Sequence, residues 1–274
     1  LKSQNVSVKF TKKQLQEYMK CAEDAFYFIE KYVKIVSIDK GFIPIDLYPY
    51  QKEMISKSTN NRFVISKLPR QSGKTTVIAA LILWYVLFNE NYSVAILAHK
   101  AEQSREILGR LQLAYEALPK WLQQGVKEWN KGSLELENGS KIKATSTSGA
   151  SARGGSYNLI YLDEFAFVPA HVQSSFFSSV YPTISSGNTS KIIITSTPNG
   201  MELFYKLWTD SVEERNSYVR VEVGWWDVPG RDEAWKEETI RNTSEQQFRQ
   251  EFGCVDGDTM ITIERNGIIE DIPI

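Results

Sequence analysis

Few side chains in this sequence suit a structural metal site or a disulfide framework. The two cysteines, Cys21 and Cys254, lie far apart, and the two histidines, His99 and His171, are not spaced as zinc ligands. We therefore expect neither disulfides nor a zinc site, and the scarcity of cysteine favours an intracellular protein. Any metal ion is expected to arrive with a substrate.

The chain also lacks an excess of charge and a long apolar run. Its formal net charge is −1, so contact with nucleic acid must come from local clusters of basic side chains, and a uniformly basic coat protein is excluded. The longest apolar run, Val77 to Phe88, is shorter than the roughly 20 residues that cross a bilayer. Residues 1–9 carry no signal-peptide core. We expect a cytoplasmic protein with no membrane contact.

What the chain does contain is four short apolar runs that predict buried strands. They are rich in β-branched residues and continuous rather than alternating, as in parallel strands that are covered on both faces. The stretches between them are long enough for crossover helices. The runs are Arg62–Ser66, Ser93–Leu97, Asn158–Leu162 and Lys191–Thr195. We therefore predict an α/β fold with a doubly wound, mainly parallel sheet.

Three further segments flank this predicted sheet. Apolar residues recur at steps of three and four from Leu15 to Val36, which predicts one N-terminal helix that Thr11 caps. Asn138-Gly139 lies between two alternating stretches and predicts an inserted β-hairpin over residues 134–143. Trp- and Glu-rich helical sequence predicts a small subdomain at 200–253. The expected domains are thus a core at 1–199, this subdomain, and a separate tail at 254–274.

The segment that follows the first predicted strand has the features of a phosphate-binding loop. It leads from the strand to an apolar helix, so backbone N–H groups and the helix N-terminus face an anion. We expect Lys74 to reach the β- and γ-phosphates of ATP and the Thr75 hydroxyl to bind Mg²⁺. The nucleotide-binding residues predicted here are Arg70, Gln71, Ser72, Gly73, Lys74, Thr75 and Thr76. The first glycine of the usual pattern is replaced by Leu68, so the loop taken alone is an incomplete match.

Two adjacent carboxylates, Asp163 and Glu164, end a later strand. In this context we expect Asp163 to hold the Mg²⁺ and Glu164 to orient and deprotonate the water that attacks the γ-phosphate. The alternative is a strand that simply reaches solvent. Together with the phosphate loop, the pair predicts an ATPase with a RecA-like core.

The next predicted strand ends in the hydroxyl side chains of Thr195, Ser196 and Thr197. Ligands of doubly wound folds bind at the carboxyl edge of the sheet, so these residues are candidates for sensing the γ-phosphate and coupling its loss to motion. Simple turn chemistry is the alternative. Arg70 and Arg153 are candidates for stabilising charge in the transition state, although either could instead contact DNA or solvent.

Candidate residues for binding the adenine base of ATP precede the loop in the sequence. The amide of Gln51 can pair with N6 and N7 of adenine together, and Tyr48 or Tyr50 could stack on the base. The alternative is an ordinary Tyr-Pro-Tyr turn.

Several motifs resemble the ATPase half of large terminase subunits of T-even-type tailed phages. They are Arg70–Thr76, Ala95–Lys100, Glu128–Ser133, Ala152–Ser156, Ile193–Gly200 and Gln247–Phe252. The similarity covers most of residues 40–253, and the loop form without its first glycine is itself typical of that family.

The resemblance implies an ATP-driven motor that packages double-stranded DNA into a capsid. It implies ATP and Mg²⁺ as ligands, with Lys74, Asp163 and Glu164 in the roles given above. The implied partners are a homo-oligomeric ring at a portal and a small terminase subunit, in the host cytoplasm. In the family a nuclease domain follows, and no nuclease residues are assigned here. A superfamily 2 helicase, which needs a second RecA-like domain, and a nucleotide-gated DNA-binding module are the competing hypotheses.

The last 21 residues do not resemble that family. Cys254, the turn Gly257-Asp-Thr259 and a short β run resemble the first block of an intein. We therefore expect Cys254 to be a splicing nucleophile that attacks the carbonyl of Gly253, and the chain to be the first product of a split gene or a truncated chain. Its complementary fragment would carry the rest of the intein and the nuclease. The alternative is an ordinary terminal hairpin with a buried cysteine.

Overall fold

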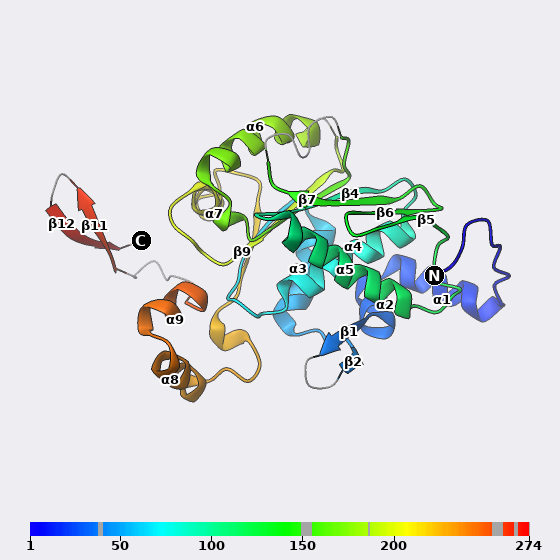
Figure 1. Cartoon of the computed structure of the whole chain (residues 1–274), viewed down its shortest axis with the longest axis horizontal. Helices are drawn as coiled ribbons and strands as arrows, with labels where there is room; N and C mark the ends of the chain where they lie inside the picture. The colour runs from blue at the N-terminus through cyan, green and yellow to red at the C-terminus, as the bar shows by residue number, and fades with distance from the viewer. Residues whose placement is uncertain (38–40, 149–154, 186, 254–259, 266–267, 274) are drawn as a thin grey trace.

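A sheet of eight strands forms the centre of the molecule (Figure 1). The computed structural model describes residues 1–37, 41–148, 155–185, 187–253, 260–265 and 268–273. In spatial order the strands are β10 (Val219–Glu222), β3 (Phe63–Lys67), β9 (Lys191–Ser196), β8 (Leu159–Asp163), β4 (Ser93–Ala98), β7 (Lys141–Ser146), β6 (Ser133–Leu136) and β5 (Val126–Trp129). Neighbours from β10 to β7 pair in parallel, and β6 and β5 are antiparallel additions. The predicted parallel sheet is confirmed, and each of the four apolar runs is one of its strands.

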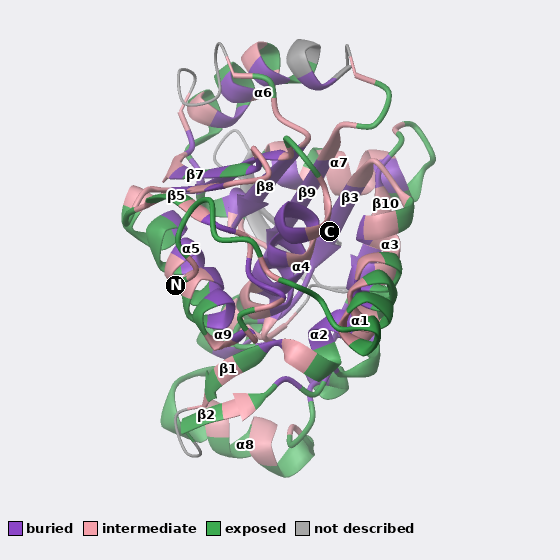
Figure 2. Cartoon of the chain, turned by 90° about the vertical axis from the view of Figure 1, so that its right-hand side faces the viewer, coloured by how far each residue is buried: buried purple, intermediate pink, exposed green. Residues whose placement is uncertain are grey.

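Helices cover both faces of the sheet. One face carries α3 (Pro49–Asn60), α4 (Lys74–Phe88) and α5 (Ala101–Ala117), and the other carries α6 (Ala170–Ser185) and α7 (Leu203–Val212) (Figure 1). Alternate strand residues therefore enter two separate cores. Most of α4 is buried, as Figure 2 shows, because the sheet, α3 and α5 pack around it. This placement explains why its sequence is apolar on every side.

The N-terminal apolar stripe forms two helices instead of the predicted one, α1 (Lys12–Glu23) and α2 (Ala25–Tyr32). Asp24 separates them in an extended conformation, and its carboxylate accepts a hydrogen bond from the N–H of Tyr27, which caps the second helix. The predicted cap at Thr11 is confirmed, since its hydroxyl accepts from the N–H of Gln14 at 3.2 Å. The end of the stripe then belongs to a small antiparallel pair, β1 (Lys34–Ser37) and β2 (Gly41–Pro44).

The predicted hairpin is present, with Gly139 in the left-handed conformation at its turn (φ 82°). It extends the main sheet, because β7 also pairs with β4.

The expected subdomain at 200–253 contributes a strand, β10, to the edge of the main sheet. The same range also contains α7, which covers the main sheet, the 3₁₀ turn η2 (Trp225–Asp227), α8 (Glu233–Asn242) and α9 (Glu245–Glu251), whereas the turn η1 (Phe165–Phe167) follows β8. The boundaries of the core, the subdomain and the tail stay predictions.

The tail forms a two-stranded antiparallel sheet of its own, β11 (Met260–Arg265) and β12 (Ile268–Pro273). Two residues singled out from the sequence, Arg153 and Cys254, lie outside the described residues. Among the helices of the described segments, none combines the length and apolar character that crossing a bilayer requires.

Candidate active site

The loop between β3 and α4 turns sharply at two left-handed residues, Gln71 (φ 58°) and Gly73 (φ 74°). Gly73 also leaves room for a neighbouring side chain. A Cβ at this position would lie 2.7 Å from Nε2 of Gln51, so the end of the Gln51 side chain would have to shift. The glycine therefore lets α4 begin at Lys74 directly against its neighbours.

The missing first glycine also has a structural explanation. Leu68 is fully buried in the core between the sheet and α4. Its N–H donates to the carbonyl of Ser196 at 3.1 Å, which continues the pairing of β3 with β9. The chain is still strand-like at this position, so an apolar side chain is favoured and a glycine is not needed.

The first predicted pair of catalytic residues meets directly. Lys74 Nζ lies 2.7 Å from Oε1 of Glu164, and the lysine side chain is only 6% exposed. Next to it, the Thr75 hydroxyl lies 3.5 Å from Oδ1 of Asp163. Because β3 and β8 are parallel strands of one sheet, their carboxyl ends bring together residues that are far apart in the sequence. The structure thus assembles the four residues expected to handle phosphate, metal and water.

The carboxylate of Asp163 accepts hydrogen bonds from two buried hydroxyl groups. Tyr161 donates to its Oδ1 at 2.6 Å, and Thr195 donates to the same oxygen at 3.0 Å. Burial raises the pKa of Asp163 above the ordinary carboxyl value, and the hydrogen bond from Tyr161 opposes this rise. The sequence analysis missed Tyr161. Its position two residues before Asp163, on the same face of a strand, was the available signal.

Glu164 is held by the end of β9. It adopts a left-handed conformation (φ 49°) just after β8, and its Oε2 accepts from both the N–H and the hydroxyl of Thr197, each at 3.2 Å. The Ser196 hydroxyl lies 3.5 Å from the same oxygen and also accepts from the N–H of Ala166. All three residues predicted to couple hydrolysis to motion therefore lie beside the two acidic residues.

Gln51 and Tyr50 contact the loop itself. The Gln51 amide donates to the Ser72 carbonyl at 3.1 Å and accepts from the N–H of Tyr48, and the Tyr50 hydroxyl donates to the same Ser72 carbonyl at 2.7 Å. Both amide atoms of Gln51 are thus occupied by backbone groups. An adenine-reading role would require it to exchange these bonds, and that role stays a prediction. The Tyr48 ring is partly exposed beside Tyr50.

The C-terminal helices contact the other side of the loop. Arg70 is 64% exposed and pairs with Glu251 at 2.8 Å, and its N–H donates to the Glu251 carbonyl. Arg231 donates to the carbonyls of Arg70 and Gln71 at 2.9 and 3.4 Å. The guanidinium of Arg70 is therefore turned towards α9 instead of towards Glu164. Glu251 belongs to the motif Gln247–Phe252, but its contact with Arg70 and that of Arg231 were not predicted, since the paired residues are 181 and 161 positions apart.

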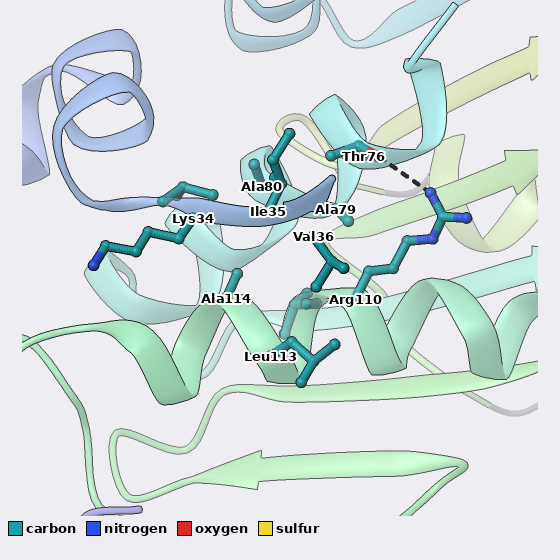
Figure 3. Close-up of a pocket in the computed structure, with 11 residues that line it drawn as sticks. Lys34, Ile35, Val36, Thr76, Ala79, Ala80, Arg110, Leu113 and Ala114 are labelled. Carbon is teal, nitrogen blue, oxygen red and sulfur yellow. Dashed lines mark hydrogen bonds between the residues drawn. The ribbon is translucent and has the colours of Figure 1, made fainter. Parts of the chain in front are cut away.

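The side chain of Thr76 points into a different region from those of Lys74 and Thr75. Its hydroxyl accepts a hydrogen bond from Arg110 at 3.1 Å, and both side chains line a hollow of about 340 Å³ (Figure 3). This hollow lies between β1, α4 and α5, and neither Lys74 nor the two carboxylates line it. The Thr76 hydroxyl is therefore not brought to the predicted phosphate site.

The residues around Thr75 fit a magnesium ion. Mg²⁺ prefers oxygen ligands and is usually held by one or two protein groups together with substrate phosphates. The hydroxyl of Thr75 and the carboxylate of Asp163 supply such oxygens, and they already lie within 3.5 Å of each other. The hydrogen bonds that fix Asp163 leave it suited to this role.

Residues 65–267 match the family described as terminase large subunit, T4likevirus-type, N-terminal. The chain belongs to this family. The match includes the loop, both carboxylates and the end of β9, and it ends within the tail that the sequence analysis had set apart. The resemblance to large terminases is thereby confirmed, and the intein interpretation of the tail stays a prediction.

Solved terminase structures share this fold. The large terminase of bacteriophage HK97 is 22% identical, with a TM-score of 0.69 over 84% of this chain and 54% of that protein. The terminase ATPase domain of Thermus phage P74-26 is 20% identical, with a TM-score of 0.65 over 84% of this chain and 96% of that domain. A thermophilic bacteriophage terminase in complex with ATP-gamma-S is 14% identical, with a TM-score of 0.59 over 76% of this chain and 52% of that protein. This terminase chain thus spans about half the length of the HK97 protein, and the RecA-like core is confirmed.

Proposed function

We propose that this chain is the ATP-hydrolysing part of a phage DNA-packaging motor, which moves double-stranded DNA into a capsid. The observation that carries the proposal is the contact of Lys74 with Glu164 at 2.7 Å, beside Thr75 and Asp163 at the carboxyl edge of the sheet. Membership of the terminase family supports it. So does the likeness to terminase structures, one of which is a complex with ATP-gamma-S.

In this proposal the Lys74 ammonium group binds the β- and γ-phosphates and leaves Glu164. The freed Glu164 carboxylate orients a water molecule and accepts its proton as the water oxygen bonds to the γ-phosphorus and the bond to the leaving ADP oxygen breaks. Thr75 and Asp163 would hold Mg²⁺, which neutralises phosphate charge when it is bound. Thr197 keeps Glu164 in place through its N–H and hydroxyl.

The end of β9 is the proposed link from chemistry to motion. Thr195 contacts Asp163, whereas Ser196 and Thr197 contact Glu164. A change in either carboxylate when the γ-phosphate leaves would therefore alter hydrogen bonds to consecutive residues of one strand. We expect this displacement to pass to the segment after β9 and finally to bound DNA.

The proposed partners are other copies of this chain in a ring at a portal, a small terminase subunit and double-stranded DNA, in the host cytoplasm. Turnover of ATP with and without double-stranded DNA tests the function. Mg²⁺-dependent turnover that rises with DNA supports a packaging motor. Binding of ATP without hydrolysis would instead favour a nucleotide-gated binding module, and stimulation by single strands with duplex unwinding would favour a helicase.

The arginine that completes the site is proposed to be Arg153 of a neighbouring copy. In this chain Arg70 is paired with Glu251, so its guanidinium must break that pair before it can act in cis. We predict that Arg153→Ala protein and Glu164→Gln protein, each inactive alone, regain turnover when mixed, because intact Arg153 and intact Glu164 then meet at mixed interfaces. Turnover is measured across mixing ratios, and Arg241→Ala serves as an exposed-arginine control. Absence of recovery at every ratio would assign the role to Arg70 or to another residue.

We also propose that Cys254 starts protein splicing. Its thiol would attack the Gly253 carbonyl, the peptide C–N bond would break, and the proton would pass to the released amine, which leaves a thioester. The intein-like residues Cys254 and Gly257–Thr259 support this, together with the antiparallel pair β11 and β12. The partner would be a complementary fragment with the rest of the intein and a nuclease.

We predict that incubation with this fragment joins residue 253 to new sequence and releases the tail. Intact-mass measurement detects the ligated product, and dithiothreitol should cleave the thioester at the Gly253–Cys254 junction. Cys254→Ala should lose both reactions, whereas Cys21→Ala, the matched cysteine control, should keep them. Ligation by Cys254→Ala at the normal level would refute the proposal.

A further inference from the structure

The phenol of Tyr161 lies in the core directly behind the carboxylate of Asp163. Tyr161 is 0% exposed, and its hydroxyl donates to Oδ1 of Asp163 at 2.6 Å. The same hydroxyl lies 2.9 Å from the hydroxyl of Thr195, which itself donates to that Oδ1 at 3.0 Å. Three oxygen-bearing side chains thus form a closed triangle inside the protein.

Strand geometry brings these three side chains together. Tyr161 and Asp163 are two residues apart on β8, so they project from the same face of the sheet. The register pairs Asp163 with Thr195 and Tyr161 with Ile193, which places the threonine hydroxyl beside both. A one-residue shift of β8 against β9 would place Tyr161 and Asp163 on the face of the sheet opposite to Thr195, and the three side chains would no longer be in contact.

The triangle holds Asp163 in one orientation. Within the described part of the chain, every hydrogen bond recorded for this carboxylate, from Tyr161, Thr195 and Thr75, falls on Oδ1. The carboxylate is therefore fixed about its terminal torsion by groups on β8, β9 and α4. Its second oxygen is left for another ligand.

We propose that Tyr161 is a positioning residue that orients Asp163 towards the magnesium ion of Mg·ATP. This inference rests on the proposed ATPase function and deepens it. A phenylalanine would fill the same core space, so packing alone gives no reason for a hydroxyl, and a buried hydroxyl without partners is unfavourable. Groups that orient a metal-binding carboxylate in this way typically strengthen metal binding.

The test replaces only the hydroxyl, in Tyr161→Phe. Binding of Mn²⁺, used in place of Mg²⁺, is measured by electron paramagnetic resonance in the presence of a non-hydrolysable ATP analogue, and turnover is measured against Mg²⁺ concentration. We expect metal affinity to fall about tenfold to a hundredfold. Affinity for the analogue without metal should stay unchanged, because the loop and Lys74 are intact.

Three further variants give the comparison its controls. Tyr115→Phe removes the hydroxyl of another fully buried tyrosine, one that donates to the Gln124 carbonyl, and should leave metal affinity unchanged. Thr195→Ser keeps a hydroxyl and should retain most of the affinity, whereas Thr195→Val should lose it in the same way as Tyr161→Phe. If Tyr161→Phe does not fold, Thr195→Val and Thr195→Ser test the triangle through its other hydroxyl, and equal metal affinity in these two variants would overturn the positioning role.

The outcomes separate this inference from the proposed function. Wild-type protein that binds the Mn²⁺–analogue complex but shows no turnover contradicts the ATPase proposal and leaves the metal-binding comparison valid. Equal Mn²⁺ affinity and equal Mg²⁺ dependence in wild type and Tyr161→Phe overturn the positioning role. A loss of affinity in Tyr115→Phe as large as in Tyr161→Phe would also overturn it, since the effect would then come from core stability.

Discussion

Replacing Glu164 with glutamine is expected to lower ATP turnover by about 10²–10⁴-fold while nucleotide stays bound. The amide keeps the shape of the side chain and can still accept from Thr197, but it cannot take a proton from the attacking water. The substitution also removes the negative charge that pairs with Lys74 at 2.7 Å. Lys74 is then free to bind phosphate, so affinity for ATP should be equal or higher. Single-turnover hydrolysis and equilibrium binding of a labelled nucleotide measure the two effects separately.

Glu222→Gln is the matched control for this variant. Glu222 pairs with Lys67 at 2.6 Å on the adjoining strands β10 and β3, so its replacement also breaks a lysine–glutamate pair near the loop. Turnover of this control should remain close to wild type. Full turnover by Glu164→Gln would show that another group is the general base.

Replacing Lys74 with alanine is expected to remove most nucleotide binding, with a loss of about 2–5 kcal/mol of binding free energy. The lysine ammonium group is nearly buried and is the cation that Glu164 contacts. Without it, the phosphates would face the carboxylates of Glu164 and Asp163 with no opposing lysine charge. Titration with a non-hydrolysable analogue measures the loss, and the melting temperature reports any cost to the fold.

Lys67→Ala is the corresponding control. Lys67 is also largely buried, is paired with a glutamate, and lies at the end of the strand that leads into the loop. It should retain nucleotide affinity within a few-fold of wild type. Equal affinity losses in the two alanine variants would mean that disturbance of the loop, and not a phosphate contact, explains the effect of Lys74→Ala.

The elements that were predicted well are those that depend on local sequence. Continuous β-branched runs indicated β3, β4, β8 and β9 because strands buried on both faces favour apolar residues at successive positions. The loop was recognisable because Gly73-Lys74-Thr75 stands between an apolar strand and an apolar helix, and the structure gives Gly73 a left-handed conformation there. The adjacent acidic residues became informative because they end a buried strand that follows the predicted phosphate loop in the chain, whereas the same pair alone would also fit a strand that reaches solvent.

The features that were missed have two causes, a local ambiguity in the N-terminal stripe and contacts between distant segments. The stripe from Leu15 to Val36 fits one helix, yet Asp24 interrupts it, because a short polar side chain can cap a new helix as readily as it can continue the old one. The pairing of Arg70 with Glu251 and the contacts of Arg231 join residues that no spacing rule connects. The hydroxyl of Tyr161 looked like ordinary core sequence until the strand register was known.

By itself the sequence determined the strands, the turn at Gly73 before α4 and the position of the two acidic residues at the end of β8, because these follow from backbone conformation and side-chain burial over a few residues. Only the tertiary structure decided the order of the strands. It placed β9 between β3 and β8, so that Thr195 and Thr197 reach Asp163 and Glu164. Register and strand order are set by the packing of whole faces against helices, which involves many residues at once. That packing, more than any single motif, brings residues from separate parts of the sequence together in one site.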